Sequence, residues 1–127
     1  MASVTDGTSN TLFFGERCHR DSVFDAQAAA NGGQQVIGQY GFWHAAAGLA
    51  VVDVTMTTLA PINYRVDASQ NWNTCACLRT SAFGSLHPNG ANFALVDGSV
   101  RFIAQTIDMT PYRALSTRAG NEVGSAP

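Results

Sequence analysis

The chain has 127 residues, of which 46% are hydrophobic and only 13% are charged, and its formal net charge is −2. This length fits a single domain over residues 1–127 with one modest core, and the composition argues against a disordered chain. All seven basic residues are arginines that are scattered along the sequence. Without a basic stripe, we expect no nucleic-acid partner.

Membrane and secretion signals are absent from the sequence. No run of about 18 apolar residues occurs, so we expect no membrane span in this chain. The opening residues, MASVTDGTSNT, lack the charged start and apolar centre of a signal peptide. We therefore expect a cytoplasmic location for the chain as written.

Three cysteines are present, at Cys18, Cys75 and Cys77. The last two form C-x-C rather than the C-x2-C of zinc knuckles, and no second pair supports a metal site. In an oxidising compartment we expect one disulfide, from Cys18 to either Cys75 or Cys77. In the cytoplasm we expect free thiols.

The first third of the chain predicts one strand and one short helical piece. Residues 5–10 (TDGTSN) are rich in turn formers, and residues 11–17 (TLFFGER) predict a strand, with a helical turn from Gly7 as the alternative. Residues 19–35 predict a polar loop that contains a helical piece at residues 23–30.

The middle of the chain predicts a strand followed by a long connection. β-Branched residues dominate residues 51–58, which favours a strand. Residues 60–80 contain Pro61, several asparagines and both nearby cysteines, which indicates an irregular connection. Long connections of this kind are more often functional than idle.

The stretch HPNGANFALVDGSVRF, residues 87–102, predicts a β-hairpin. Asp97-Gly98 lies between two β-rich runs and suits a two-residue type I′ turn. This turn would place Leu95 opposite Val100 and Phe93 opposite Phe102, so that the four side chains share one apolar face.

The C-terminal region predicts a short helix. Asp108 or Thr110 can cap it, Pro111 suits its first turn, and Gly120 ends it. Together the elements predict an α+β fold, with a small antiparallel sheet that includes a C-terminal hairpin and with a short C-terminal helix.

Three segments resemble one bacterial family, in order and in spacing. They are TDGTSNTLFFGER (residues 5–17), HPNGANFALVDGSVRFI (residues 87–103) and IDMTPYRALSTRAGNEV (residues 107–123). The second resembles the H-x9-DG signature of the prepilin-like proteins of domain of unknown function 1559, which are abundant in planctomycetes and described as type II secretion pseudopilin-like.

This resemblance implies a pseudopilin-like globular domain with a structural or interaction role. Family members begin with a leader and an apolar helix that anchors them in the inner membrane, with a periplasmic domain after it. The chain as written opens at the first segment, without that helix. We therefore expect an exposed apolar face that favours protein partners or self-association.

The first segment also resembles a calcium loop in part. Asp6, Thr8 and Asn10 take positions 1, 3 and 5 of an EF-hand, but Thr11 stands where glycine is needed and Arg17 where a bidentate glutamate is needed. The spacing therefore favours an Asx-type turn. A composite calcium site of Asp6, Glu16 and Asp97 stays open, because relatives in type II secretion often bind calcium.

The alternative function is a calcium-dependent or other metal-dependent hydrolase of small esters or lactones, such as acyl lactones. His87 would be the general base and Asp97 would orient it, while the metal polarises the carbonyl group. No G-x-S-x-G, H-E-x-x-H or H-x-H-x-D-H motif is present. The competing interpretation is that His87 bonds a loop near the hairpin and has a structural role.

Overall fold

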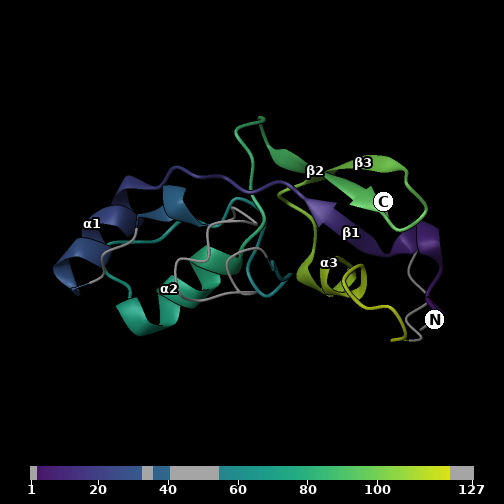
Figure 1. Cartoon of the computed structure of the whole chain (residues 1–127), viewed down its shortest axis with the longest axis horizontal. Helices are drawn as coiled ribbons and strands as arrows, with labels where there is room; N and C mark the ends of the chain where they lie inside the picture. Colours follow the sequence, from purple (N-terminus) through teal and green to yellow (C-terminus); the bar gives the residue numbers. More distant parts are fainter. Residues whose placement is uncertain (1–2, 33–35, 41–54, 121–127) are drawn as a thin grey trace.

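The computed structural model describes residues 3–32, 36–40 and 55–120, and these form an α+β fold, as the sequence predicts. The helices α1 and α2 lie at one end of the molecule, and the sheet with α3 lies at the other (Figure 1). In chain order the elements are η1 (Thr8–Asn10), β1 (Leu12–Gly15), α1 (Ser22–Ala30), η2 (Ile37–Gln39), α2 (Trp72–Ser81), β2 (Gly90–Leu95), β3 (Val100–Ala104) and α3 (Met109–Ala114).

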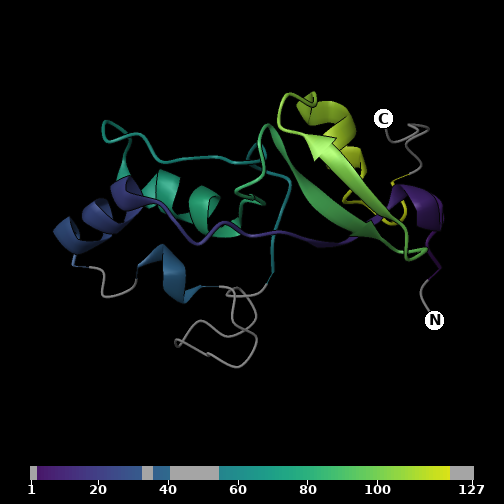
Figure 2. The ribbon, with the colours of Figure 1, turned by 90° about the horizontal axis from the view of Figure 1, so that it is seen from above.

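The sheet is antiparallel, with β2 between β1 and β3. Helix α3 lies against one face of this sheet, as the two views show (Figures 1 and 2). Tyr112 of α3 is fully buried, and its ring centroid lies 6.3 Å from that of Phe93 in β2. The core between them contains the buried residues Ile62, Phe83, Ala91, Phe93, Ile103, Tyr112 and Leu115.

A second, smaller core lies at the helical end. Its buried residues are Phe24, Ala28, Ile37, Val66 and Cys75. The ring of Phe24 in α1 lies 5.1 Å from that of Trp72 in α2. The polar connection predicted for residues 19–35 therefore contains a packed helix, longer by one residue than the predicted piece.

The N-terminal segment contains both of the elements that the sequence left open. A 3-10 turn, η1, comes first, and the strand β1 follows it. Of the strand predicted at residues 51–58, residues 51–54 lie outside the described residues. In the rest of it, Thr57 forms a single parallel bridge with Ala82.

The hairpin at Asp97-Gly98 is present, but its register differs by one residue from the prediction. Gly98 donates its N–H to the carbonyl of Leu95 (3.0 Å), and Leu95 donates its N–H to the carbonyl of Ser99 (2.9 Å). Gly98 has a φ of 84°, whereas Asp97 is not among the residues with positive φ. The loop therefore has three residues and resembles a type I turn with a glycine bulge, and the predicted type I′ turn is wrong.

This shift moves the apolar side chains of β3 to the other face of the sheet. Phe93 pairs with Arg101, and Val100 pairs with Ala94. Phe93 is buried against α3, whereas Val100 and Phe102 are exposed. Because a slip of one residue inverts the faces of a strand, the predicted shared apolar face is wrong.

Helix α2 occupies part of the connection that was predicted to be irregular over residues 60–80, and that prediction is wrong for residues 72–80. Asn71 caps the helix by accepting the N–H of Asn73 (2.9 Å). Its buried side chains are Cys75 and Arg79, which are four residues apart on one face. Because an arginine occupies the inward face, the sequence lacks the periodic pattern of apolar residues that normally indicates a helix.

The C-terminal helix is shorter than predicted. It begins after Asp108 and has Pro111 in its first turn, but it ends at Ala114. The hydroxyls of Ser116 and Thr117 donate to the last helical carbonyls (2.7 and 2.8 Å), which lets the chain leave the helix early. Gly120 therefore lies beyond the helix.

Gly90 occupies a close approach between β2 and β3, which generates a test of the packing. A Cβ at Gly90 would collide with the carbonyl oxygen of Ile103 and with the ring of Phe102, 2.6 Å away. We expect Gly90→Ala to lower the free energy of unfolding by about 1–3 kcal/mol in urea denaturation. Gly38→Ala is the control, because its Cβ would meet only the carbonyl of His19 at an ordinary 3.6 Å. Equal stability of the two variants would contradict this packing.

Candidate functional site

Hydrogen bonds join the three segments that carry the family resemblance. Asp6 accepts the hydroxyl of Thr117 (3.2 Å) and the N–H of Gly120 (2.8 Å), which ties the first segment to the third. Asp97 donates its N–H to the carbonyl of Thr8 (3.1 Å), which ties the second segment to the first. Residues far apart in the sequence thus form one connected region around the sheet.

Asp97 stabilises the hairpin loop. Its Oδ1 accepts both the hydroxyl (2.6 Å) and the N–H (2.8 Å) of Ser99, and its side chain is exposed. The hydroxyl and then the backbone bond from Ser99 lower the pKa of Asp97. These contacts account for the aspartate of the H-x9-DG signature as a turn residue.

His87 contacts Glu16 and not Asp97. Its Nε2 lies 3.4 Å from Oε1 of Glu16, so the two form an ion pair when the imidazole is protonated. The backbone N–H of His87 donates to the hydroxyl of Ser85 (3.0 Å). His87 precedes β2 and Asp97 follows it, and six strand residues at about 3.4 Å each separate them by roughly 20 Å.

Glu16 is the centre of this small polar network. Its Oε2 accepts the backbone N–H of Asn92 in β2 (2.7 Å). Burial acts to raise the pKa of Glu16, but the bonds from the Asn92 backbone, the Ser85 hydroxyl and the Asn92 amide, together with the charge of His87, lower it below its ordinary value. Glu16 is therefore a carboxylate at neutral pH.

The order of these groups decides which chemistry they allow. In a Ser-His-acid triad the imidazole lies between the hydroxyl and the carboxylate. Here the carboxylate of Glu16 contacts both Ser85 and His87, so the imidazole does not activate the serine. The contact between His87 and Glu16 has the geometry in which a carboxylate can orient an imidazole.

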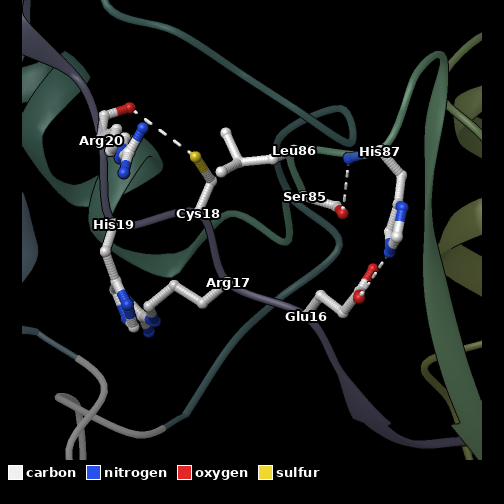
Figure 3. Close-up of a pocket in the computed structure, with 8 residues that line it drawn as sticks. All are labelled: Glu16, Arg17, Cys18, His19, Arg20, Ser85, Leu86 and His87. Carbon is white, nitrogen blue, oxygen red and sulfur yellow. Dashed lines mark hydrogen bonds and ion pairs between the residues drawn. The ribbon is translucent and has the colours of Figure 1, made fainter.

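These residues line an open pocket with a volume of about 500 Å³. Residues 16–20, which leave the sheet after β1, form one side, and residues 85–87, which lead into β2, form the other. Along the pocket, Figure 3 shows the Glu16–His87 pair at one end and the side chains of Arg17, His19 and Arg20 toward the other end. A pocket of this volume accommodates a small molecule.

The three carboxylates of the predicted calcium site lie apart. Asp6 and Asp97 are near η1, at one end of β1, and Glu16 follows the other end of that strand. Within the ranges that the structure describes, no three His, Cys, Asp or Glu side chains are grouped so that they could hold a metal ion.

All three cysteines are free, so neither disulfide expected for an oxidising compartment is present. Cys75 is buried in the helical core. Cys18 is buried at the pocket, where its sulfur accepts a hydrogen bond from Nη2 of Arg65 (3.1 Å). The pairing of Cys18 with Arg65 has no signal in the sequence spacing.

A buried ion pair positions the pocket side formed by residues 16–20. Arg79 in α2 is only 2% exposed, and its Nε donates to Oδ2 of Asp21 at 2.6 Å. Nη2 of Arg79 donates to the carbonyl of Cys18 (3.0 Å). The contacts of Asn92 and of the Arg79–Asp21 pair leave no signal in the sequence, because their partners are distant along the chain.

Loss of the Arg79 cation should strongly destabilise the protein. Arg79→Met leaves the buried Asp21 carboxylate without its partner, and we expect the free energy of unfolding at pH 7 to fall by about 3–5 kcal/mol. Arg113→Met, at an exposed position of α3, is the matched control and should change the free energy of unfolding by less than about 0.5 kcal/mol. Urea denaturation measures both.

The same pair predicts a pH dependence. Burial is the largest single influence on the pKa of Asp21 and acts to raise it. The hydrogen bonds from Arg79, Phe24 and Val66 and the charge of Arg79 together outweigh burial, so the folded-state pKa lies below the ordinary 3.8. Its stabilisation is therefore fully present above pH 3.8 and is lost as the pH falls through the lower folded value. The difference in the free energy of unfolding between the wild type and Arg79→Met should therefore become smaller in acid. A difference that stays constant with pH would contradict this account.

None of the helices in the described ranges is long and apolar enough to cross a membrane.

Comparison with known proteins agrees with the resemblance seen in the sequence. No curated protein and no solved structure matches the chain. A family model described as "Protein of unknown function (DUF1559)" matches residues 1–110, which include the first two segments in full. The chain therefore belongs to the DUF1559 family.

Proposed function

We propose that this chain is a pseudopilin-like interaction domain, and that the face of its sheet opposite α3 binds an apolar helix of a protein partner. The observation that carries this proposal is a row of apolar side chains across the three strands. Phe14 in β1 pairs with Ala94 in β2, which pairs with Val100 in β3. Phe14 is 65% exposed and Val100 is 67% exposed, and Phe102 beside them is 51% exposed.

The arrangement of large and small residues favours a rod-shaped partner along β2. The central strand presents Ala94 and Asn92 to this face, while the flanking strands present Phe14, Val100 and Phe102. A helix laid over the central strand would contact the larger side chains on both sides. Full burial of each Val or Phe side chain stabilises a complex by about 1.5–3 kcal/mol.

Membership of the DUF1559 family supports the same proposal. The prepilin-like relatives have an apolar helix that precedes their globular domain. A sheet face with exposed Phe14 and Val100 is the surface on which such a helix would be buried. The partner helix thus belongs to a pilin-type protein, or to a segment of this type in the same protein.

The test is binding of a fluorescein-labelled amphipathic peptide with one Leu/Val/Ala stripe, measured by fluorescence anisotropy. We expect Val100→Ser and Phe102→Ser each to weaken binding by about tenfold or more, because the stripe loses its apolar contacts. Leu59→Ser is the matched control, since Leu59 is 61% exposed but lies outside the sheet.

Two outcomes would contradict helix binding. One is equal affinity for the wild type and both sheet variants, and the other is equal affinity for a scrambled peptide without the stripe. Size-exclusion chromatography with light scattering adds a second readout. A concentration-dependent dimer that Val100→Ser abolishes would show that a second copy covers this face in place of the helix.

A second candidate function is hydrolysis of small esters or lactones, and the Glu16–His87 contact at the pocket favours it. His87 would accept a proton from water, and Glu16 would orient the imidazole. The metal ion expected from the sequence would polarise the substrate carbonyl group if one were bound, but no three His, Cys, Asp or Glu side chains of the described residues are grouped to hold it. Asp97, at the far end of β2, has no part in this version of the site.

This candidate predicts turnover of an acyl lactone and ester panel that is lost in His87→Ala by about 10²–10⁴-fold. Glu16→Gln should lower the rate as well, because the imidazole loses its orienting partner. Arg113→Gln, far from the pocket, is the control for contaminating hydrolases. Addition of a chelator tests the metal, and a rate no higher than buffer across the panel rejects the enzyme.

A further inference from the structure

Folding gathers arginines that are scattered along the sequence. Two of the seven, Arg17 and Arg20, lie in the segment of residues 17–21, and two more, Arg65 and Arg79, contact this segment. Arg79 is neutralised by Asp21. The chain as a whole has a net charge of −2, so this gathering of cations is local and does not follow from composition.

Two of these arginines have no carboxylate partner within the part of the chain that the structure describes. Arg20 and Arg65 are exposed and form no ion pair with a described residue. Arg65 donates to the backbone carbonyl of Arg20 and to the sulfur of Cys18, which holds its guanidinium against residues 18–20. Arg20 lines both the 500 Å³ pocket and an adjoining pocket of about 410 Å³ that also contacts Arg65.

The pocket itself contains more positive than negative groups. Its charged and titratable lining residues are Glu16, Arg17, His19, Arg20 and His87. Its one carboxylate, Glu16, already accepts hydrogen bonds from Asn92 and Ser85. Arg20 is the exposed arginine of this lining, and its guanidinium is the cation that the pocket offers to a ligand from solvent.

The charges of two of these arginines also act on His19. Burial is the largest cause that lowers the pKa of His19, and the nearby charges of Arg17 and Arg79 lower it further, against a bond to the Tyr40 backbone that raises it. Protonation of His19 is thus disfavoured by cations on neighbouring segments. An anion at the same place would offset their effect.

We propose that the pocket between residues 16–20 and residues 85–87 binds a small oxyanion, a carboxylate or phosphate group of a soluble molecule, through the guanidinium of Arg20. A guanidinium matches the geometry of a carboxylate or phosphate with two parallel N–H···O bonds. Arg17 supplies further positive potential at the pocket. This site is independent of the sheet face, and it requires no turnover.

Isothermal titration calorimetry with phosphate, pyrophosphate and succinate tests the proposal, each against sodium chloride at equal ionic strength to remove general screening. We expect saturable binding of at least one of the three anions. A preference for phosphate or for succinate shows whether the pocket selects a phosphate group or a carboxylate group. Arg20→Gln should weaken it by about tenfold or more. Arg113→Gln, an exposed arginine on α3, is the matched control and should leave affinity unchanged.

Nuclear magnetic resonance of the wild type gives a readout that does not depend on any variant. Amide shifts on titration should concentrate at residues 16–20 and 85–87, and the pKa of His19 should rise when the anion is bound. Three results would each overturn the proposal. They are amide shifts concentrated elsewhere, an equal loss of affinity in Arg20→Gln and Arg113→Gln, and the lack of saturable binding with a Kd below about 1 mM for all three anions.

Discussion

The buried contact between Arg79 and Asp21 is the interaction on which the arrangement of this protein depends. Asp21 accepts the N–H of Phe24 and so caps α1, and its other oxygen accepts Nε of Arg79 from α2. Arg79 in turn donates to the carbonyl of Cys18. Burial of such a pair costs about as much desolvation energy as its attraction returns. Its main effect is therefore geometric, since each partner satisfies the other only in this one arrangement of the two helices.

That arrangement determines where the pocket lies. The chain leaves the sheet after Glu16 and is held to α2 by Arg79, so the residues between them form one wall of the pocket. Glu16 also accepts the N–H of Asn92, which keeps this wall next to β2. The hairpin of β2 and β3 presents the exposed side chain of Val100 on the face of the sheet opposite α3. One small sheet thus supports a polar pocket at its end and an apolar surface on its face.

Local features of the structure were predictable wherever a local pattern determines them. The strand at residues 12–15, the helix at residues 22–30 and the turn at Gly98 follow from β-rich runs, helix formers and the positive φ of glycine. The hairpin register was not predictable, because the same residues are compatible with a two-residue loop and with a three-residue loop. The choice between these loops shifts the pairing by one residue, which exchanges the two faces of β3. Helix α2 was missed because Arg79 occupies an inward position that only its partner Asp21 makes acceptable.

The sequence by itself determined the family and the α+β class, and it singled out His87 and Asp97 as residues to examine. It could not determine their partners, because contacts between residues far apart in the chain leave no mark in the spacing. Tertiary structure placed Glu16 beside His87 and left Asp97 with Ser99 in the hairpin loop. It also brought Arg65 and Arg79, from two other segments, into contact with residues 18–21 beside the pocket. The reason is physical: a side chain's chemistry depends on the charges and donors within a few ångströms, and only the folded chain decides which those are.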